Sequence, residues 1–135
     1  MTTIKEKAEV LMQKSEIVVL SSVNPEGYPR PVPMSKIKSE GISTIWMATG
    51  KSSLKTKDFH KNPQAGLCLY TEGDSIVLTG NVEIVTDDKN KKELWQGWFI
   101  QHFPKGVNDP EYILLKFQAN HATLWIDQQF IHRKL

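Results

Sequence analysis

Three prolines alternate with other residues in one short segment, Pro29, Pro31 and Pro33, and they limit how this chain can build a β-sheet. The residues around them, 28–38, otherwise alternate as a strand does, and a turn-like segment at 24–27 precedes them. Residues two apart on a strand direct their backbone groups to the same side, and proline has no N–H to donate there. We therefore predict a strand with one unpaired backbone side, which is either exposed or covered by something other than a strand.

The rest of the chain alternates between strand-like and helix-like segments. We find no repeat or linker, so we expect a single domain over residues 1–135. Strands are expected at residues 17–23, 28–38, 42–48, 65–71 and 75–86, with a bulge at Gly80 and one or two more strands within 112–126. Helices are expected at residues 4–14, at 54–61 and from Asp87 onward, the last one carrying Leu94, Trp95 and Trp98. This pattern predicts a mainly β fold, a small six-stranded antiparallel barrel with helices packed outside it.

Composition excludes several classes of protein. The 135 residues are 39% hydrophobic and 24% charged, and 17 basic against 15 acidic residues give a net charge of +2. This is typical of a globular protein, and it predicts no nucleic-acid partner. No segment is long and apolar enough to predict a membrane span. The histidines are scattered and predict no metal site, and Cys68 stands alone in an apolar run, so we expect a reduced, cytoplasmic protein.

The segment between the third strand and the second helix has the groups that anion binding needs. Hydroxyls and ammonium groups gather there, from Thr49, Ser52, Ser53, Lys51 and Lys55. The start of the helix adds unpaired N–H groups and a partial positive charge, which together favour a phosphate. The glycine-to-lysine spacing is not that of a Walker loop. The same residues also fit an ordinary serine-capped helix with solvated lysines, so the segment by itself leaves both interpretations open.

Arg30 lies at the start of the proline-containing strand, and a guanidinium can hold phosphate oxygens in a bidentate manner. A neighbouring strand could bring it close to the Thr49–Lys55 segment. A surface arginine after a turn is the alternative interpretation. The combination of an unpaired strand edge, an arginine on that edge and a hydroxyl-rich helix start favours a phosphate site more than any one of them does.

Five further segments keep an order and spacing that point to a known family. They are residues 27–34 (Gly-Tyr-Pro-Arg-Pro-Val-Pro-Met), 46–49 with 53–55 and Asn62-Pro63, 78–87, Trp95 with 103–106 (Phe-Pro-Lys-Gly), and 122–125 (Ala-Thr-Leu-Trp). Together they cover nearly the whole chain. The chain resembles the FMN-binding split-barrel family, which includes the pyridoxamine 5′-phosphate oxidases, and within it the small general stress protein 26-like branch.

The resemblance implies FMN as cofactor and a homodimer with the flavin at the interface. It implies that the FMN phosphate is held by Arg30, Lys55, Thr49 and Ser53, and Ser52 belongs to the same cofactor-binding set. It implies that the isoalloxazine ring lies along the backbone of Pro31, Val32 and Pro33 and is flanked by Met47 and Ala48. The reaction it implies is hydride transfer to or from the flavin, with NAD(P)H or another small molecule as the partner.

Two departures from the family pattern narrow this expectation. The chain ends at residues 130–135 without the Arg-x-His substrate motif of the pyridoxamine 5′-phosphate oxidases, which argues against that substrate. Ser53-Leu54-Lys55 stands where the family often has Ser-Arg-Lys, which removes one cation. The pattern assigns no catalytic residue, although Tyr70, Tyr112 and His102 could each donate a proton. A flavin-binding stress protein or sensor without turnover, a haem or deazaflavin binder on the same fold, and a protein-interaction barrel remain alternatives.

Overall fold

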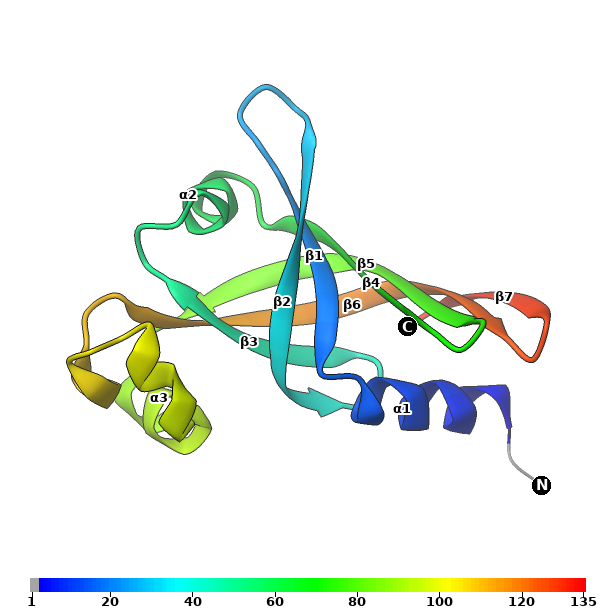
Figure 1. Ribbon diagram of the computed structural model, residues 1–135. Helices are drawn as coiled ribbons and strands as arrows, with labels where there is room; N and C mark the ends of the chain where they lie inside the picture. Colours follow the sequence, from blue (N-terminus) through cyan, green and yellow to red (C-terminus); the bar gives the residue numbers. More distant parts are fainter. Residues whose placement is uncertain (1–2) are drawn as a thin grey trace.

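Residues 3–135 are described by a computed structural model (Figure 1). Its elements are α1 (Ile4–Lys14), β1 (Ile17–Val23), β2 (Pro29–Glu40), β3 (Thr44–Gly50), α2 (Leu54–Lys61), β4 (Gln64–Thr71), β5 (Asp74–Val85), α3 (Asp88–Leu94), the 3-10 helices η1 (Gly97–Gln101) and η2 (Gly106–Asn108), β6 (Tyr112–Ile126) and β7 (Gln129–Lys134). The strands pair in the order β3-β2-β1-β4-β5-β6-β7, and β3 also pairs with β6. That last pairing closes six antiparallel strands into a barrel, with β7 added at its outside. The predicted fold is confirmed.

The barrel is split along β2. Residues Pro29–Ser35 of this strand pair with β1, whereas its pairing with β3 covers only Lys36–Glu40. The backbone side of β2 that faces away from β1 is therefore open where the prolines lie. Because prolines have no N–H, that edge offers carbonyl acceptors and cannot be completed by another strand. The predicted unpaired strand edge is confirmed.

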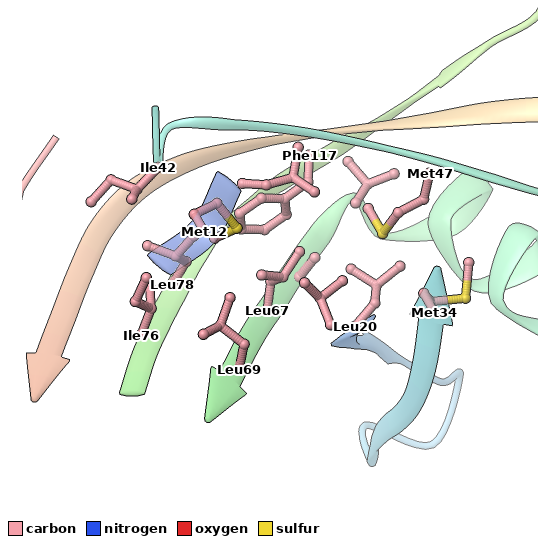
Figure 2. Packing of buried hydrophobic residues seen from close by; sticks show 14 of the residues in the cluster. Met12, Leu20, Met34, Ile42, Met47, Leu67, Leu69, Ile76, Leu78 and Phe117 are labelled. Atoms are coloured by element: carbon pink, nitrogen blue, oxygen red, sulfur yellow. The ribbon is translucent and has the colours of Figure 1, made fainter. Parts of the chain in front are cut away.

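One large hydrophobic cluster fills the barrel. Side chains from all six barrel strands point toward one another, and Met12 of α1 joins them at one end (Figure 2). The cluster includes Leu20, Leu67, Leu78 and Phe117, each at most 2% exposed. Burying a side chain of this size contributes about 1.5–3 kcal/mol, so this cluster dominates the stability of the fold.

A second cluster lies outside the barrel, where β3 ends and β6 begins. Aromatic rings dominate it: Trp46, Phe99, Phe103 and Tyr112 are buried there, with Trp95 packed against them. α2 and α3 lie toward this end of β3, and α1 lies toward the opposite end (Figure 1). The aromatic cluster therefore attaches the η1–η2 segment to the same end of the barrel at which α2 begins.

Of the one or two strands expected within residues 112–126, the structure has one, which is continuous. Two sequence expectations need correction. β7 follows as a strand that the pattern did not predict. The β6–β7 hairpin turns at Asp127 and Gln128, whose φ angles are +52° and +64°. A turn with positive φ at both central positions normally has asparagine or glycine, so its sequence signal is missing here. The third helix ends at Leu94, because Trp95 adopts an extended backbone (φ −62°, ψ 135°), and Trp98 lies in η1 instead.

The predicted irregularity at Gly80 is confirmed. The register between β5 and β6 shifts between Thr79 and Gly80. A Cβ at Gly80 would lie 2.0 Å from the backbone oxygen of Gln118, so only glycine fits this close approach. Across residues 3–135, no helix combines the length and apolar character that crossing a bilayer requires.

Candidate functional site

The loop between β3 and α2 is built by its own hydroxyls. Ser53 is the N-cap of α2, and its Oγ accepts from the Thr56 N–H at 3.3 Å. Thr56 Oγ1 in turn donates to the Gly50 carbonyl at 2.8 Å, which folds the loop back onto the end of β3. The first N–H groups of α2, at Leu54 and Lys55, have no partner within the helix. These contacts leave a helix start with free donors facing outward from a fixed loop.

Lys55 lies in the first turn of α2, directly after this loop. Its ammonium donates to Thr49 Oγ1 at 2.9 Å, and no carboxylate lies within ion-pair distance of it among residues 3–135. Burial lowers the pKa of Lys55 below its usual value, and the positive charge of Arg30 lowers it further. Arg30 is bonded to Asp58, three residues after Lys55 in α2, so the same helix brings the two cations together. Among residues 3–135, Lys55 has no carboxylate partner.

Arg30 is oriented by a buried carboxylate. Its Nε donates to Asp58 Oδ2 at 3.1 Å, and the same oxygen accepts from Ser22 Oγ at 2.7 Å. The side chain of Asp58 is 7% exposed, whereas that of Arg30 is 39% exposed. Because Asp58 binds Nε, the two terminal nitrogens of the guanidinium remain available to a ligand. Asp58 was not predicted as part of the site, because nothing in the sequence links it to a residue 28 positions earlier.

Ser52 is hydrogen-bonded to Glu111. Its N–H donates to Glu111 Oε2 at 3.1 Å and its hydroxyl donates to Glu111 Oε1 at 2.7 Å. Both hydrogen bonds lower the pKa of Glu111, and the bond from the hydroxyl lowers it most. The polar groups of Ser52 are therefore occupied within the protein. Glu111 was also missed by the sequence analysis, since it lies 59 positions away from Ser52.

A cleft of about 400 Å³ opens beside this loop. Its lining comes from β2 (Pro33, Met34, Ser35), β3 (Ala48, Thr49, Gly50), the η1 segment (Trp98, Phe99, His102, Phe103) and Glu111. Trp98 stands edge-on to Phe99, with ring centroids 4.7 Å apart, and His102 stands edge-on to Trp98 at 5.9 Å. The cleft therefore has an aromatic wall on one side and the open edge of β2 on the other, which suits a flat ring.

The remaining predicted residues divide between the cleft and the core. Pro31 and Pro33 are exposed on the open edge of β2, and Val32 packs against the barrel core. Ala48 and Thr49 line the cleft. Met47 is fully buried and points into the barrel, as Figure 2 shows, and it is not part of the cleft lining. The reason is the strand alternation, which directs Met47 and Ala48 to opposite faces of β3.

Of the possible proton donors, only His102 lies at the cleft. The hydroxyl of Tyr112 donates to the Lys91 carbonyl at 2.8 Å, and burial raises the pKa of Tyr112 to about 12. Tyr70 is 75% exposed on β4 and does not line the cleft. Lys55 and Arg30 do not line the cleft, but Lys55 is bonded to Thr49 of its lining, and Arg30 is bonded to Asp58 of the same helix α2. Positive charge next to an aromatic cleft can bind a ligand with an anionic group and a planar ring.

The family is decided by a sequence profile described as pyridoxamine 5′-phosphate oxidase like, which matches residues 4–132. This chain belongs to the pyridoxamine 5′-phosphate oxidase-like family. Among curated proteins, none matches the sequence.

Solved structures place the chain near one branch of the pyridoxamine 5′-phosphate oxidase-like family. A Clostridium acetobutylicum protein related to general stress protein 26 of Bacillus subtilis is 26% identical with a TM-score of 0.85, over 96% of this chain and 92% of that one. General stress protein 26 of Bacillus anthracis is also 26% identical, with a TM-score of 0.80 over 98% of each chain. The predicted general stress protein 26-like branch is confirmed.

Two more distant structures share the fold of the pyridoxamine 5′-phosphate oxidase-like family. A pyridoxamine 5′-phosphate oxidase-related, FMN binding protein of Nostoc punctiforme is 14% identical with a TM-score of 0.70, over 96% of this chain and 91% of that one. A heme binding protein of Mycobacterium smegmatis is 9% identical with a TM-score of 0.77, over 98% of this chain and 58% of that one. At these identities, the likeness concerns the fold.

Proposed function

We propose that this chain is a flavoprotein that binds FMN with its phosphate between Arg30 and Lys55. The observation that carries the proposal is the half-buried Lys55 ammonium, which has no carboxylate partner among residues 3–135 and lies one turn of α2 before Asp58, the partner of Arg30. Two neighbouring cations repel each other, and a phosphate dianion relieves that repulsion. The FMN-binding relative from Nostoc punctiforme is consistent with the same cofactor.

The residues divide into a phosphate group and a ring group. Arg30, Lys55, Thr49 and Ser53 hold the phosphate, and the free N–H groups at the start of α2 add to them. Ser52 holds the loop through Glu111 rather than contacting the phosphate. The backbone of Pro31 and Pro33 and the cleft beside Ala48 receive the ring. The open edge of β2 offers carbonyl acceptors, which match a ring that carries an N–H donor.

When bound, FMN would supply hydride or electron transfer, which makes an FMN-dependent oxidoreductase the activity we infer. The chain's own residues bind and orient the cofactor, and the aromatic wall at Trp98 excludes water from one side of the cleft. His102 is the one imidazole on the cleft lining, where it is able to hold a proton near a bound ring. We infer NAD(P)H or a small organic molecule as the electron partner, in the cytoplasm.

We also infer a homodimer that completes the flavin site. Exposed apolar side chains of β1, β4, β5 and β7 share the outer face of the sheet by their register: Ile17, Tyr70, Val77 and Phe130. A second copy that packs across a two-fold axis would cover these apolar side chains. Light scattering should give twice the chain mass, and Val77→Asp should shift the protein to a monomer. A monomeric wild-type protein would contradict the dimer.

The decisive experiment is a titration of dialysed protein with FMN and with riboflavin, which lacks the phosphate. Fluorescence should show FMN binding at least about tenfold more tightly, because hydrogen bonds to charged groups contribute about 1.5–3 kcal/mol each and 1.4 kcal/mol is tenfold. Arg30→Ala should abolish most of this preference. A protein that takes up neither compound, or binds both equally, would refute the phosphate site.

Further measurements separate this function from the alternatives. Mass spectrometry of the ligand released from freshly purified protein distinguishes FMN from haem or deazaflavin. Anaerobic mixing of the FMN-loaded protein with NADPH or NADH tests turnover, since a sensor or carrier should leave the flavin oxidised. Reduction that continues when an electron acceptor is added supports the oxidoreductase.

A further inference from the structure

Glu111, the residue just before β6, accepts three hydrogen bonds from the β3–α2 loop. β3 and β6 pair as far as Gly50 and Tyr112, and Lys51 N–H then donates to the Glu111 carbonyl at 2.8 Å. The Glu111 carboxylate accepts from both donors of Ser52, from the N–H at 3.1 Å and from the hydroxyl at 2.7 Å. One residue therefore binds the loop through its backbone and through both carboxylate oxygens.

Glu111 is itself held by a second carboxylate. Its N–H donates to Asp109 Oδ1 at 3.0 Å, and the Lys105 N–H donates to Asp109 Oδ2 at 3.2 Å. Asp109 is 5% exposed, so these bonds are shielded from water. Lys105 lies two residues after Phe103, which lines the aromatic side of the cleft. The hydrogen bonds thus run from the cleft wall through Asp109 and Glu111 to the loop that precedes α2.

Glu111 forms no ion pair with either cation. Of the ion pairs among residues 3–135, one joins Arg30 to Asp58, and none involves Glu111 or Lys55. Glu111 therefore holds the loop without pairing directly with the positive charge that a phosphate needs. Both oxygens of the Glu111 carboxylate are bonded to Ser52. Two bonds between the same pair of residues fix the orientation of one relative to the other.

We propose that Glu111, supported by Asp109, is a positioning residue that presets the phosphate-binding loop relative to the aromatic cleft. This inference rests on the proposed function. A preset loop loses less conformational freedom when the phosphate arrives, which increases affinity without a direct contact. Glu111 also lines the cleft, so loss of its contact with the ring would weaken FMN and riboflavin alike, whereas loss of the preset loop should weaken FMN above all.

The test compares FMN and riboflavin affinities for Glu111→Gln. The FMN dissociation constant should rise about fivefold or more, the loss expected for weakened charged hydrogen bonds, with the riboflavin constant changed less than about twofold. Ser52→Ala, which removes one bond from the other side, should change the same ratio by less. Glu83→Gln, an exposed carboxylate on β5, is the matched control and should change neither constant. An unchanged ratio in Glu111→Gln, or an equal loss for both ligands, would overturn the proposal.

A ligand-free measurement separates this proposal from the proposed function. Hydrogen exchange of residues 50–55 should be faster in Glu111→Gln than in wild type, and Glu83→Gln should match wild type. If wild type binds neither FMN nor riboflavin, the FMN function is refuted. The role of Glu111 in fixing the loop is then tested by the hydrogen exchange of residues 50–55 alone. Unchanged exchange at residues 50–55 would then overturn the role of Glu111.

Discussion

The two sides of the candidate site are stabilised in opposite ways. The loop side, around Ser53 and Lys55, is held by short hydrogen bonds between hydroxyls, carbonyls and carboxylates. The wall side, around Phe99, is held by aromatic rings whose centroids lie 4.7–5.7 Å apart, from Trp95, Trp98 and Tyr112. Hydrogen bonds are directional and fix an orientation, whereas ring packing fixes a shape. A ligand with a charged end and a flat end would use both, and each side can be tested separately.

The largest effect is expected on the wall side. Phe99→Ala removes a ring that is 1% exposed and touches most of the aromatic cluster, so the free energy of unfolding should fall by about 3–5 kcal/mol. FMN and riboflavin should both bind more weakly, because the cleft loses its shape. Chemical denaturation and the two titrations measure this.

The neighbouring exposed residue provides the control. Ile100→Ala, at a position 48% exposed, should change the free energy of unfolding by no more than about 0.5 kcal/mol. If Phe99→Ala weakened FMN binding and left riboflavin binding unchanged, the assignment of the ring to the wall side would be wrong.

A smaller and more selective effect is expected on the loop side. Lys55→Met keeps the length of the side chain and removes its charge, so FMN binding should weaken by about 1.5–3 kcal/mol. Riboflavin binding and thermal stability should stay close to wild type, because the half-buried ammonium forms no ion pair among residues 3–135. Lys57→Met, at an exposed position two residues along α2, is the control. An equal loss in both lysine variants would indicate a diffuse electrostatic attraction instead of a site.

The smallest effect is expected from alkaline pH. Burial and the charge of Arg30 lower the pKa of Lys55 below 10.5. A phosphate favours the charged lysine, so its contribution is complete below that lowered pKa and is lost as pH rises through it. As the pH is raised, the ratio of FMN to riboflavin affinity should therefore begin to fall before pH 10.5 is reached. A titration that ends near that pH should show only the first few-fold of the loss that Lys55→Met shows in full, and the riboflavin reference cancels titration of the ring. Lys55→Arg should remove the decline, because arginine stays protonated. A decline that persists in Lys55→Arg would assign it to another group.

Local features of the sequence predicted much of the fold. The bounds of α1, β1 and α2 agree with the structure, because their caps, β-branched runs and Asn62-Pro63 stop lie within a few residues of each end. The alternating prolines predicted the open edge of β2 for the same reason, since a missing N–H is a property of the residue itself. β7 and the end of α3 were not predictable in this way. A turn without glycine starts β7, and packing of Trp95 against Phe99 ends α3.

The candidate site divides along the same line. The sequence alone determined which groups are present: a helix start with hydroxyls and a lysine, and an arginine on a strand that cannot pair on one side. The tertiary structure decided how these groups are oriented. Arg30 donates to Asp58, and Ser52 donates to Glu111. The aromatic side chains of η1 form the wall opposite them. These contacts join residues 28 to 59 positions apart, and barrel closure between β3 and β6 brings the latter pair together. No local pattern encodes such a distance, because it depends on the pairing of whole strands.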